Sequence, residues 1–133
     1  MQNQREDQVR RVYDAYRTAD RAAIERLLAD DFTFTSPYDD HIDRATYFDR
    51  CWPAAGTFQA FDLKEVHAEG DTCFALYEGR SEQGVDIRNA ELFRFDGDRI
   101  ASVEVFFGLP VGGEALTPEQ AIAAVISCGG SRA

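Results

Sequence analysis

Positive charge is scarce in this chain of 133 residues, and long apolar runs are missing. Lys and Arg number 14 against 24 Asp and Glu, so the formal net charge is −10. A nucleic-acid backbone or an anionic membrane attracts clustered cations, so this balance argues against both partners. No run approaches the roughly 20 apolar residues of a membrane span. The first residues, MQNQREDQVRR, lack the apolar core of a signal peptide. We therefore expect a cytoplasmic protein.

Cysteines are also few, and the motifs of several enzyme classes are absent. Cys51, Cys73 and Cys128 are odd in number and show neither a CxxC nor a metal-like spacing, so we expect reduced thiols. The sequence has no GxSxG motif, no cysteine beside a histidine and no phosphate-binding glycine motif. These absences argue against nucleophilic catalysis and a nucleotide, and we expect no cofactor.

The composition that remains is that of an ordinary globular domain. Hydrophobic residues make up 44% of the chain and charged residues 29%. The length suits one domain with one sizeable core. We expect that domain to cover residues 1–128, with its core at about 5–108 and a disordered tail, GGSRA, at 129–133.

Apolar residues recur at helical spacing near the N-terminus. A first helix is predicted within about residues 4–18, because Val9, Val12, Tyr13 and Tyr16 fall at i, i+3, i+4 and i+7. Asp20 is a typical N-cap for a short second helix that ends near Asp30.

A strand and a third helix are predicted next. Residues 32–35 (FTFT) alternate like a strand, which the Ser36-Pro37 step should end. Asp43 is a plausible cap for a helix that Pro53 closes.

After Pro53 the spacing of apolar residues changes from a helical period to the period of two that is typical of strands. Four strands are predicted, at residues 57–68, 71–79, 85–96 and 99–107. Glu69-Gly70 and Gly97-Asp98 are predicted hairpin turns. Thr117-Pro118 begins a predicted C-terminal helix at 118–128, whose apolar stripe should be buried at a pocket mouth or against a second copy. The order of elements predicts an α+β fold.

Two stretches resemble a known family. VRRVYDAYRTADRAAIERLLADDFTFTSP near the start and AELFRFDGDRIASVEVFFG near the end are similar to the SnoaL-like and ketosteroid-isomerase-like proteins of the nuclear transport factor 2-like superfamily. The resemblance implies a cone-shaped α+β barrel, in which three N-terminal helices pack in the concave face of a strongly bent, mainly antiparallel sheet. It also implies a pocket at one end and frequent homodimers. It implies no single activity, since the fold hosts isomerases, dehydratases, cyclases and inert binding domains.

The ketosteroid isomerase machinery is only partly matched. Those enzymes use a carboxylate base before a proline, a tyrosine on the first helix and a protonated carboxylic acid on a late strand. The corresponding positions here hold Ser36, Val12 and Glu91. Serine cannot take a proton from carbon at neutral pH, so we do not expect steroid isomerisation by that mechanism.

Glu91 is the most distinctive candidate residue. Strand alternation places it on an apolar face together with Ile87, Asn89, Phe93 and Phe95. A carboxyl there should have a raised pKa or a partner, because burying its charge is costly. It could be a general acid or hydrogen-bond donor in a pocket, or a structural carboxylate paired with an arginine or tyrosine.

A second polar cluster lies at Asp39, Asp40, His41 and Asp43. Consecutive side chains in an extended segment diverge and no further histidine or cysteine group adjoins them, so we expect no metal site. His41 or Asp40 could work as a base at the pocket mouth. Alternatively, the segment is a turn with His41 on the surface and Asp43 as a helix cap.

We expect a small-molecule pocket that supports cofactor-free acid–base catalysis of the isomerase, dehydratase or cyclase type. Glu91 would be the acid or hydrogen-bond donor, and His41 or Asp40 the base. Residues predicted to contact the small, apolar substrate are Tyr16, Phe34, Ser36, Trp52, Asn89, Phe93, Val103, Val105 and Phe107. The alternative is a non-catalytic ligand-binding or dimerisation domain. The expected partners are the ligand and a second copy of the chain, with no nucleic acid and no membrane.

Overall fold

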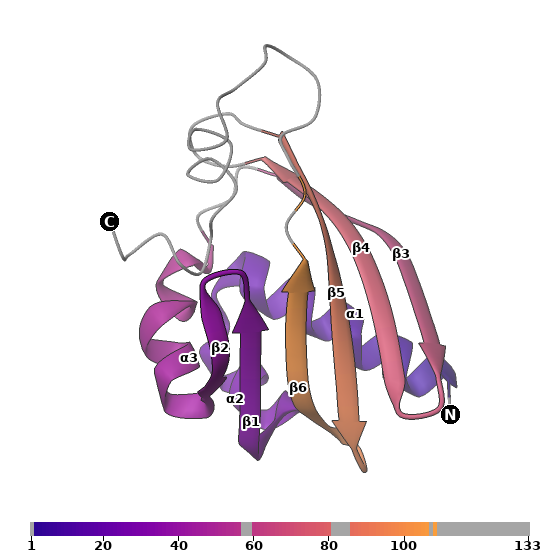
Figure 1. Ribbon diagram of the computed structural model, residues 1–133. Helices are drawn as coiled ribbons and strands as arrows, with labels where there is room; N and C mark the ends of the chain where they lie inside the picture. Colours follow the sequence, from indigo (N-terminus) through magenta and orange to yellow (C-terminus); the bar gives the residue numbers. More distant parts are fainter. Residues whose placement is uncertain (1, 57–59, 81–85, 107, 109–133) are drawn as a thin grey trace.

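A computed structural model describes residues 2–56, 60–80, 86–106 and 108 (Figure 1). In these residues, two helices, two strands and a third helix come first, and a run of four strands follows. The elements are α1 (Gln2–Thr18), α2 (Arg21–Leu27), β1 (Leu28–Ser36), β2 (Asp39–Asp43), α3 (Arg44–Arg50), the single 3-10 turn η1 (Trp52–Ala54), β3 (Ala60–Glu69), β4 (Thr72–Arg80), β5 (Asp86–Asp96) and β6 (Arg99–Phe106).

The strands form one mixed sheet in the order β2-β1-β6-β5-β4-β3. Strands β3 to β6 are an antiparallel meander, and β1 joins it by pairing in parallel with β6. Figure 1 shows α1 lying across one face of the sheet, where it contacts β3 and β4, while α3 packs beside β1 and β2. This is the α+β arrangement that the sequence predicts, with three N-terminal helices on a mainly antiparallel sheet.

The hairpin partner β2 is absent from the sequence prediction, which has a polar connector there. In the structure, Ile42 lies opposite Phe34 and Asp39 lies opposite Ser36, so the segment is an edge strand. Charged residues are common on edge strands because they discourage pairing with other chains. The same charges hide the alternation that identifies a strand in sequence.

The second helix also ends earlier than its sequence predicts. It stops at Leu27, and Leu28 already has the extended backbone of β1. Leu28 is buried opposite Ile100 of β6, so tertiary packing takes these residues into the sheet. The predicted helix at 118–128 and the tail at 129–133 lie outside the described residues.

Both predicted aspartate caps are confirmed. The Asp20 carboxylate accepts a hydrogen bond from the Ala23 N–H at 3.2 Å, and the Asp43 carboxylate accepts one from the Thr46 N–H at 2.8 Å. Each satisfies a backbone donor that the first turn of a helix leaves unpaired. The Asp43 cap fixes where α3 begins, directly after the edge strand.

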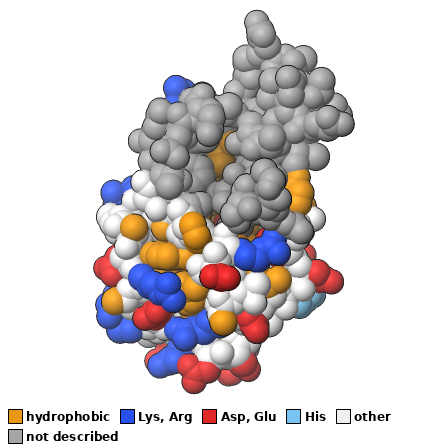
Figure 2. All heavy atoms as spheres, turned by 90° about the vertical axis from the view of Figure 1, so that its left-hand side faces the viewer, with side chains coloured by type: hydrophobic (Ala, Val, Ile, Leu, Met, Phe, Trp, Pro, Cys, Tyr) orange, Lys and Arg blue, Asp and Glu red, His pale blue; other side chains and the backbone are white. Residues whose placement is uncertain are grey.

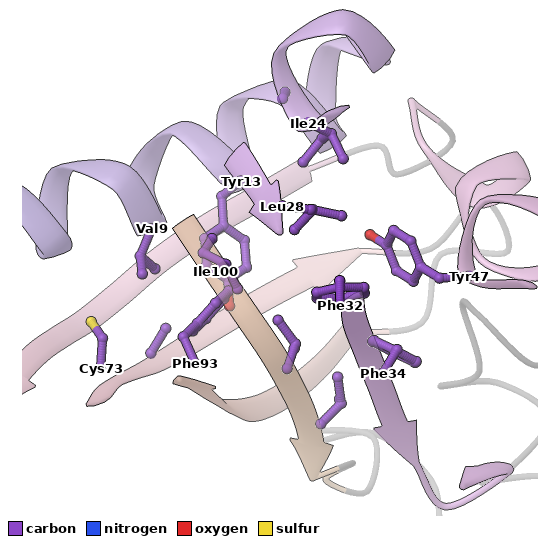
Figure 3. Close-up of a cluster of buried hydrophobic side chains, with 14 of the residues drawn as sticks. Val9, Tyr13, Ile24, Leu28, Phe32, Phe34, Tyr47, Cys73, Phe93 and Ile100 are labelled. Atoms are coloured by element: carbon purple, nitrogen blue, oxygen red, sulfur yellow. The ribbon is translucent and has the colours of Figure 1, made fainter. Parts of the chain in front are cut away.

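The core lies between the helices and the concave face of the sheet (Figure 3). Val9 and Tyr13 reach it from α1, Phe32 from β1 and Phe93 from β5, and all four are at least nine-tenths buried. Each fully buried large apolar side chain contributes about 1.5–3 kcal/mol relative to an exposed one. The core therefore fixes α1 against the sheet, and it also fixes the orientation of Tyr13 toward β5.

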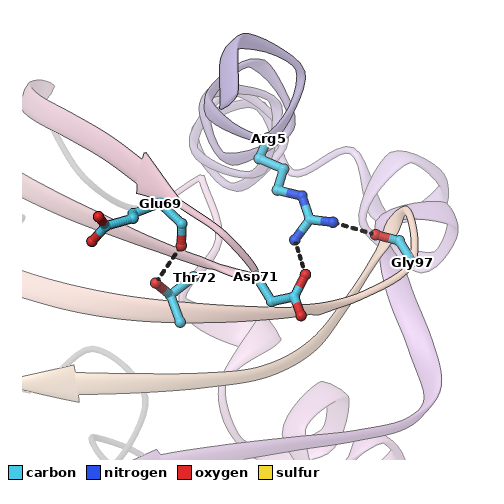
Figure 4. A network of polar contacts seen from close by, with 5 residues as sticks. All are labelled: Arg5, Glu69, Asp71, Thr72 and Gly97. Carbon is cyan, nitrogen blue, oxygen red and sulfur yellow. Dashed lines mark hydrogen bonds and ion pairs between the residues drawn. The ribbon is translucent and has the colours of Figure 1, made fainter. Parts of the chain in front are cut away.

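Arg5 ties the start of α1 to two hairpin turns (Figure 4). Its guanidinium pairs with Asp71 at 3.0 Å and donates to the Gly97 carbonyl at 3.2 Å. Gly70 and Gly97 have positive φ angles of 58° and 64° in the predicted turns, which are confirmed. Glycine suits them because other residues are strained in this backbone region.

The surface mixes both signs of charge. On the face shown in Figure 2, basic and acidic side chains are interspersed with hydrophobic ones wherever the structure is described. Within the described residues, every helix is too short or too polar to span a membrane.

Candidate functional site

Glu91 lies in the middle of β5, between Ala75 of β4 and Val105 of β6 in the sheet register. Its neighbours two positions away on the same face, Asn89 and Phe93, are 1% and 0% exposed. The structure thus places Glu91 on the concave face, as strand alternation predicts. Val105 is also buried there.

The partner of Glu91 is Tyr13 of α1. The Tyr13 hydroxyl donates a hydrogen bond to Glu91 Oε1 at 2.8 Å. Glu91 as a residue is partly exposed, but its carboxyl lies deep enough that burial raises its pKa to about 7. Hydrogen bonds from Tyr13 and Tyr77 act in the opposite direction, because they stabilise the charged form. Burial, and then the nearby Glu91 carboxylate, raise the pKa of Tyr13 well above its usual range.

A chain of hydrogen bonds continues from Glu91 along the sheet. Tyr77 bonds to Glu91 and accepts from the Asn89 side-chain amide at 2.9 Å. The Asn89 side-chain oxygen in turn accepts from the Gly108 N–H at 3.0 Å. Because Asn89 donates to the Tyr77 oxygen, the Tyr77 hydrogen is available for the carboxylate. The chain fixes the direction of the Tyr77 hydroxyl toward Glu91.

Aromatic rings surround this polar group. The Tyr13 ring lies 5.2 Å from the Tyr77 ring and 6.1 Å from the Phe93 ring, centroid to centroid. Figure 3 shows Tyr13 pointing from α1 toward the sheet and Phe93. The carboxyl is buried beside these rings, and this burial is the physical cause of its raised pKa.

The other predicted aromatic contacts lie in a different group. The Tyr16 hydroxyl donates to the Cys51 carbonyl at 3.4 Å, and its ring lies 5.9 Å from Trp52. Tyr13, one turn earlier on α1, is therefore the helix tyrosine that bonds to Glu91.

Ser36 is fully engaged by its own hairpin. Its hydroxyl donates to Asp39 Oδ2 at 2.9 Å and accepts from the Tyr38 N–H at 3.1 Å. The Asp39 side chain is 0% exposed, and its other carboxylate oxygen lies 2.7 Å from Arg50 of α3. This buried group joins β1, β2 and α3, and it is a structural contact rather than a base.

Asp40 and His41 lie on β2, at the edge of the sheet, with β1 and β6 between them and β5. Their side chains are 93% and 74% exposed and pair with each other at 2.6 Å. His41 has a positive φ of 51°. The structure does not bring either residue together with Glu91.

The remaining predicted contacts line the core beside the site. Phe34, Val103 and Val105 are buried, and Phe34 lies opposite Val103 in the parallel pair. Phe107 lies outside the described residues. Among the residues that the structure describes, no three His, Cys, Asp or Glu side chains are grouped to hold a metal ion.

Tyr77 is missing from the sequence prediction, which leaves open a tyrosine partner for Glu91 but does not assign that role to Tyr13. Tyr77 does carry a signal, because it alternates with Cys73 and Ala75, both of which are buried. The pairing of Tyr77 with Asn89 depends on the register between β4 and β5, which the sequence does not state.

Comparison with known proteins agrees with this fold. The family model of the SnoaL-like domain matches residues 9–103. A nuclear transport factor 2-like protein of unknown function from Burkholderia xenovorans superposes with a TM-score of 0.73 at 16% identity, covering 84% of this chain and 88% of that one. For one from Mesorhizobium loti the TM-score is 0.67 at 24% identity, with 80% and 92% covered. No curated protein matches the chain.

Proposed function

Because the chain belongs to the SnoaL-like domain family of the nuclear transport factor 2-like superfamily, we propose that it binds a small organic molecule against the concave face of its sheet. We further propose that it carries out proton transfer on a carbonyl-containing ligand without a cofactor. Glu91 is the group that gives and takes the proton.

The observation that carries this proposal is the Tyr13–Glu91 contact of 2.8 Å at a carboxyl whose pKa is about 7. A general acid or base works best when its pKa lies near the working pH, since both protonation states are then populated. An ordinary exposed glutamate is almost entirely ionised at neutral pH and would be a poor acid.

Such chemistry also requires hydrogen-bond donors for the ligand carbonyl, and the two tyrosines supply them. Tyr13 and Tyr77 both donate toward the Glu91 carboxylate. When Glu91 is protonated, a tyrosine hydroxyl that no longer donates to its carboxyl can donate to a ligand carbonyl instead. Negative charge that develops on that oxygen is stabilised by a donor fixed in place before the reaction.

Isomerisation fits this arrangement better than reactions that need two separate titratable groups. A single carboxyl can remove a proton from one carbon atom and return it to another. The predicted base residues, His41 and Asp40, are exposed on β2 and pair with each other. Glu91 would therefore act as base and acid in turn.

The test is deuterium exchange at the carbon next to a carbonyl, with cyclohexanone and cyclohexenone as probes in heavy water. We expect exchange above the buffer rate with the wild-type protein and none with Glu91→Gln, while ligand-induced NMR shifts persist in both. His67→Asn is the matched control, because His67 is exposed on β3 and pairs with Glu65. A wild-type protein that exchanges neither ketone overturns the proposed catalysis, and one that also binds neither ketone overturns the proposed binding site.

A non-catalytic binding domain is the second candidate. It is favoured by Ser36, which stands at the position of the catalytic base in ketosteroid isomerases. The Ser36 hydroxyl donates to Asp39 and is not a base. Ligand-induced shifts without any exchange would establish this alternative. Native mass spectrometry tests the ligand and the expected homodimer together, since a dimer has twice the 14.9 kDa of one chain and a retained ligand adds its own mass.

A further inference from the structure

A small groove opens where α1 passes over β3. Its volume is about 210 Å³, and its lining residues are Arg10, Tyr13, Asp14, Arg17 and Leu63. The four residues from α1 are spaced i, i+3, i+4 and i+7, so they form one stripe along the helix.

The groove adjoins the hydrogen-bonded group around Glu91. Tyr13 belongs to both, since its hydroxyl bonds to Glu91 while the residue also lines the groove. Leu63 lies opposite Tyr77 in the pairing of β3 with β4. The apolar part of the groove therefore backs directly onto the two tyrosines that hold the carboxyl.

The rim of the groove is cationic. Arg10 is exposed and makes no hydrogen bond or ion pair with any residue the structure describes. Arg17 uses one terminal nitrogen to pair with Asp14 at 3.2 Å, which leaves further N–H donors for a ligand. Two guanidinium groups and one carboxylate give the lining one net positive charge, in a chain whose formal net charge is −10.

Size and spacing limit what the groove can hold. Arg10 and Arg17 are seven residues apart, or about 10 Å along the helix axis, so their long side chains can converge on one anion between them. The volume equals that of about seven water molecules, since each occupies roughly 30 Å³ in the liquid. This is room for a carboxylate and a few carbon atoms.

We propose that this groove is the anion subsite of the proposed binding site and that the natural ligand is a small organic acid. Its carboxylate binds Arg10 and Arg17 through charge-assisted hydrogen bonds, and its apolar part packs on Leu63 and Tyr13. The inference rests on the proposed function, because it makes the substrate an acid with a carbonyl group a few atoms from its carboxylate.

The test compares benzoate with benzamide, which has the same shape and no charge, by NMR titration of the wild-type protein. We expect benzoate to bind more tightly, and added salt to weaken benzoate alone. Arg10→Gln and Arg17→Gln should each weaken benzoate binding about tenfold, the effect of losing one charge-assisted contact, and leave benzamide unchanged. Asp14→Asn should tighten benzoate binding because it removes the competing carboxylate.

Arg94→Gln is the matched control, since Arg94 is exposed on the outer face of β5. Equal affinity for the two probes, or an equal effect of the Arg94 and Arg10 substitutions, would overturn the anion subsite. Arginine-dependent benzoate binding without ketone exchange would overturn the proposed function alone. Ketone exchange without arginine-dependent benzoate binding would overturn the anion subsite alone.

Discussion

The Tyr13 hydroxyl donates to Glu91 Oε1 across 2.8 Å, between residues that are 78 positions apart in sequence. The contact joins α1 to the middle of β5. It places the Tyr13 hydroxyl against a buried carboxyl with a raised pKa, and the Tyr13 ring packs beside the ring of Tyr77. Four measurements test the consequences of this contact and of the packing around it.

The first prediction concerns stability against pH. The pKa of Glu91 is raised to about 7, so the folded state holds a proton that the unfolded chain releases near pH 4.5. The stabilisation is complete below the unfolded pKa and is lost as the pH rises through about 7. Relative to Glu91→Gln, the wild-type free energy of unfolding should fall by up to about 3 kcal/mol over this window. Urea unfolding at several pH values measures this free energy. If it changes with pH in parallel for the two proteins, the prediction is wrong.

The second prediction concerns the hydroxyl itself. Removing it in Tyr13→Phe should raise the pKa of Glu91 further, because the hydrogen bond from Tyr13 favours the carboxylate. A carboxyl carbon NMR titration measures this pKa. Tyr16→Phe is the control, since the Tyr16 hydroxyl donates to the Cys51 carbonyl instead. Similar shifts in both variants would mean that the effect is not specific to the contact.

The third prediction concerns the buried pair of Asp39 and Arg50. Arg50→Met should destabilise the protein by about 3–5 kcal/mol, because it leaves the fully buried Asp39 carboxylate without its counterion. The pair of Arg88 and Glu78, whose side chains are 53% and 34% exposed, offers a comparison, and Arg88→Met should cost no more than about 1 kcal/mol. Urea unfolding distinguishes the two, and equal losses would contradict the structural role given to Asp39.

The fourth prediction concerns thiol reactivity. Burial raises the pKa of Cys73 to about 11, and Cys51 is 0% exposed. Thiolate is the reactive form, so neither thiol should react with a disulfide reagent in the folded protein at mildly alkaline pH. Cys128 lies outside the described residues, so the experiment uses Cys128→Ser. Two thiols should appear only after denaturation, and rapid release of one from the folded variant would contradict the prediction.

Much of the fold is readable from local patterns. The helical spacing of Val9 and Tyr13, the cap at Asp43 and the turns at Gly70 and Gly97 each depend on a few neighbouring residues. The strand β2 is not readable, because an edge strand needs no apolar alternation to satisfy its backbone. It becomes a strand only when Phe34 and Ile42 meet in the hairpin.

The candidate site, too, is predictable from the sequence only in part. The sequence by itself places Glu91 on an apolar strand face, since alternation with period two is a local property of the backbone. Only the tertiary structure decides that Tyr13 and Tyr77 hold its carboxyl, and that Asp40 and His41 lie apart on an edge strand. Packing of α1 and the register of β4 with β5 set those contacts, and both are long-range interactions that no short stretch of the chain encodes.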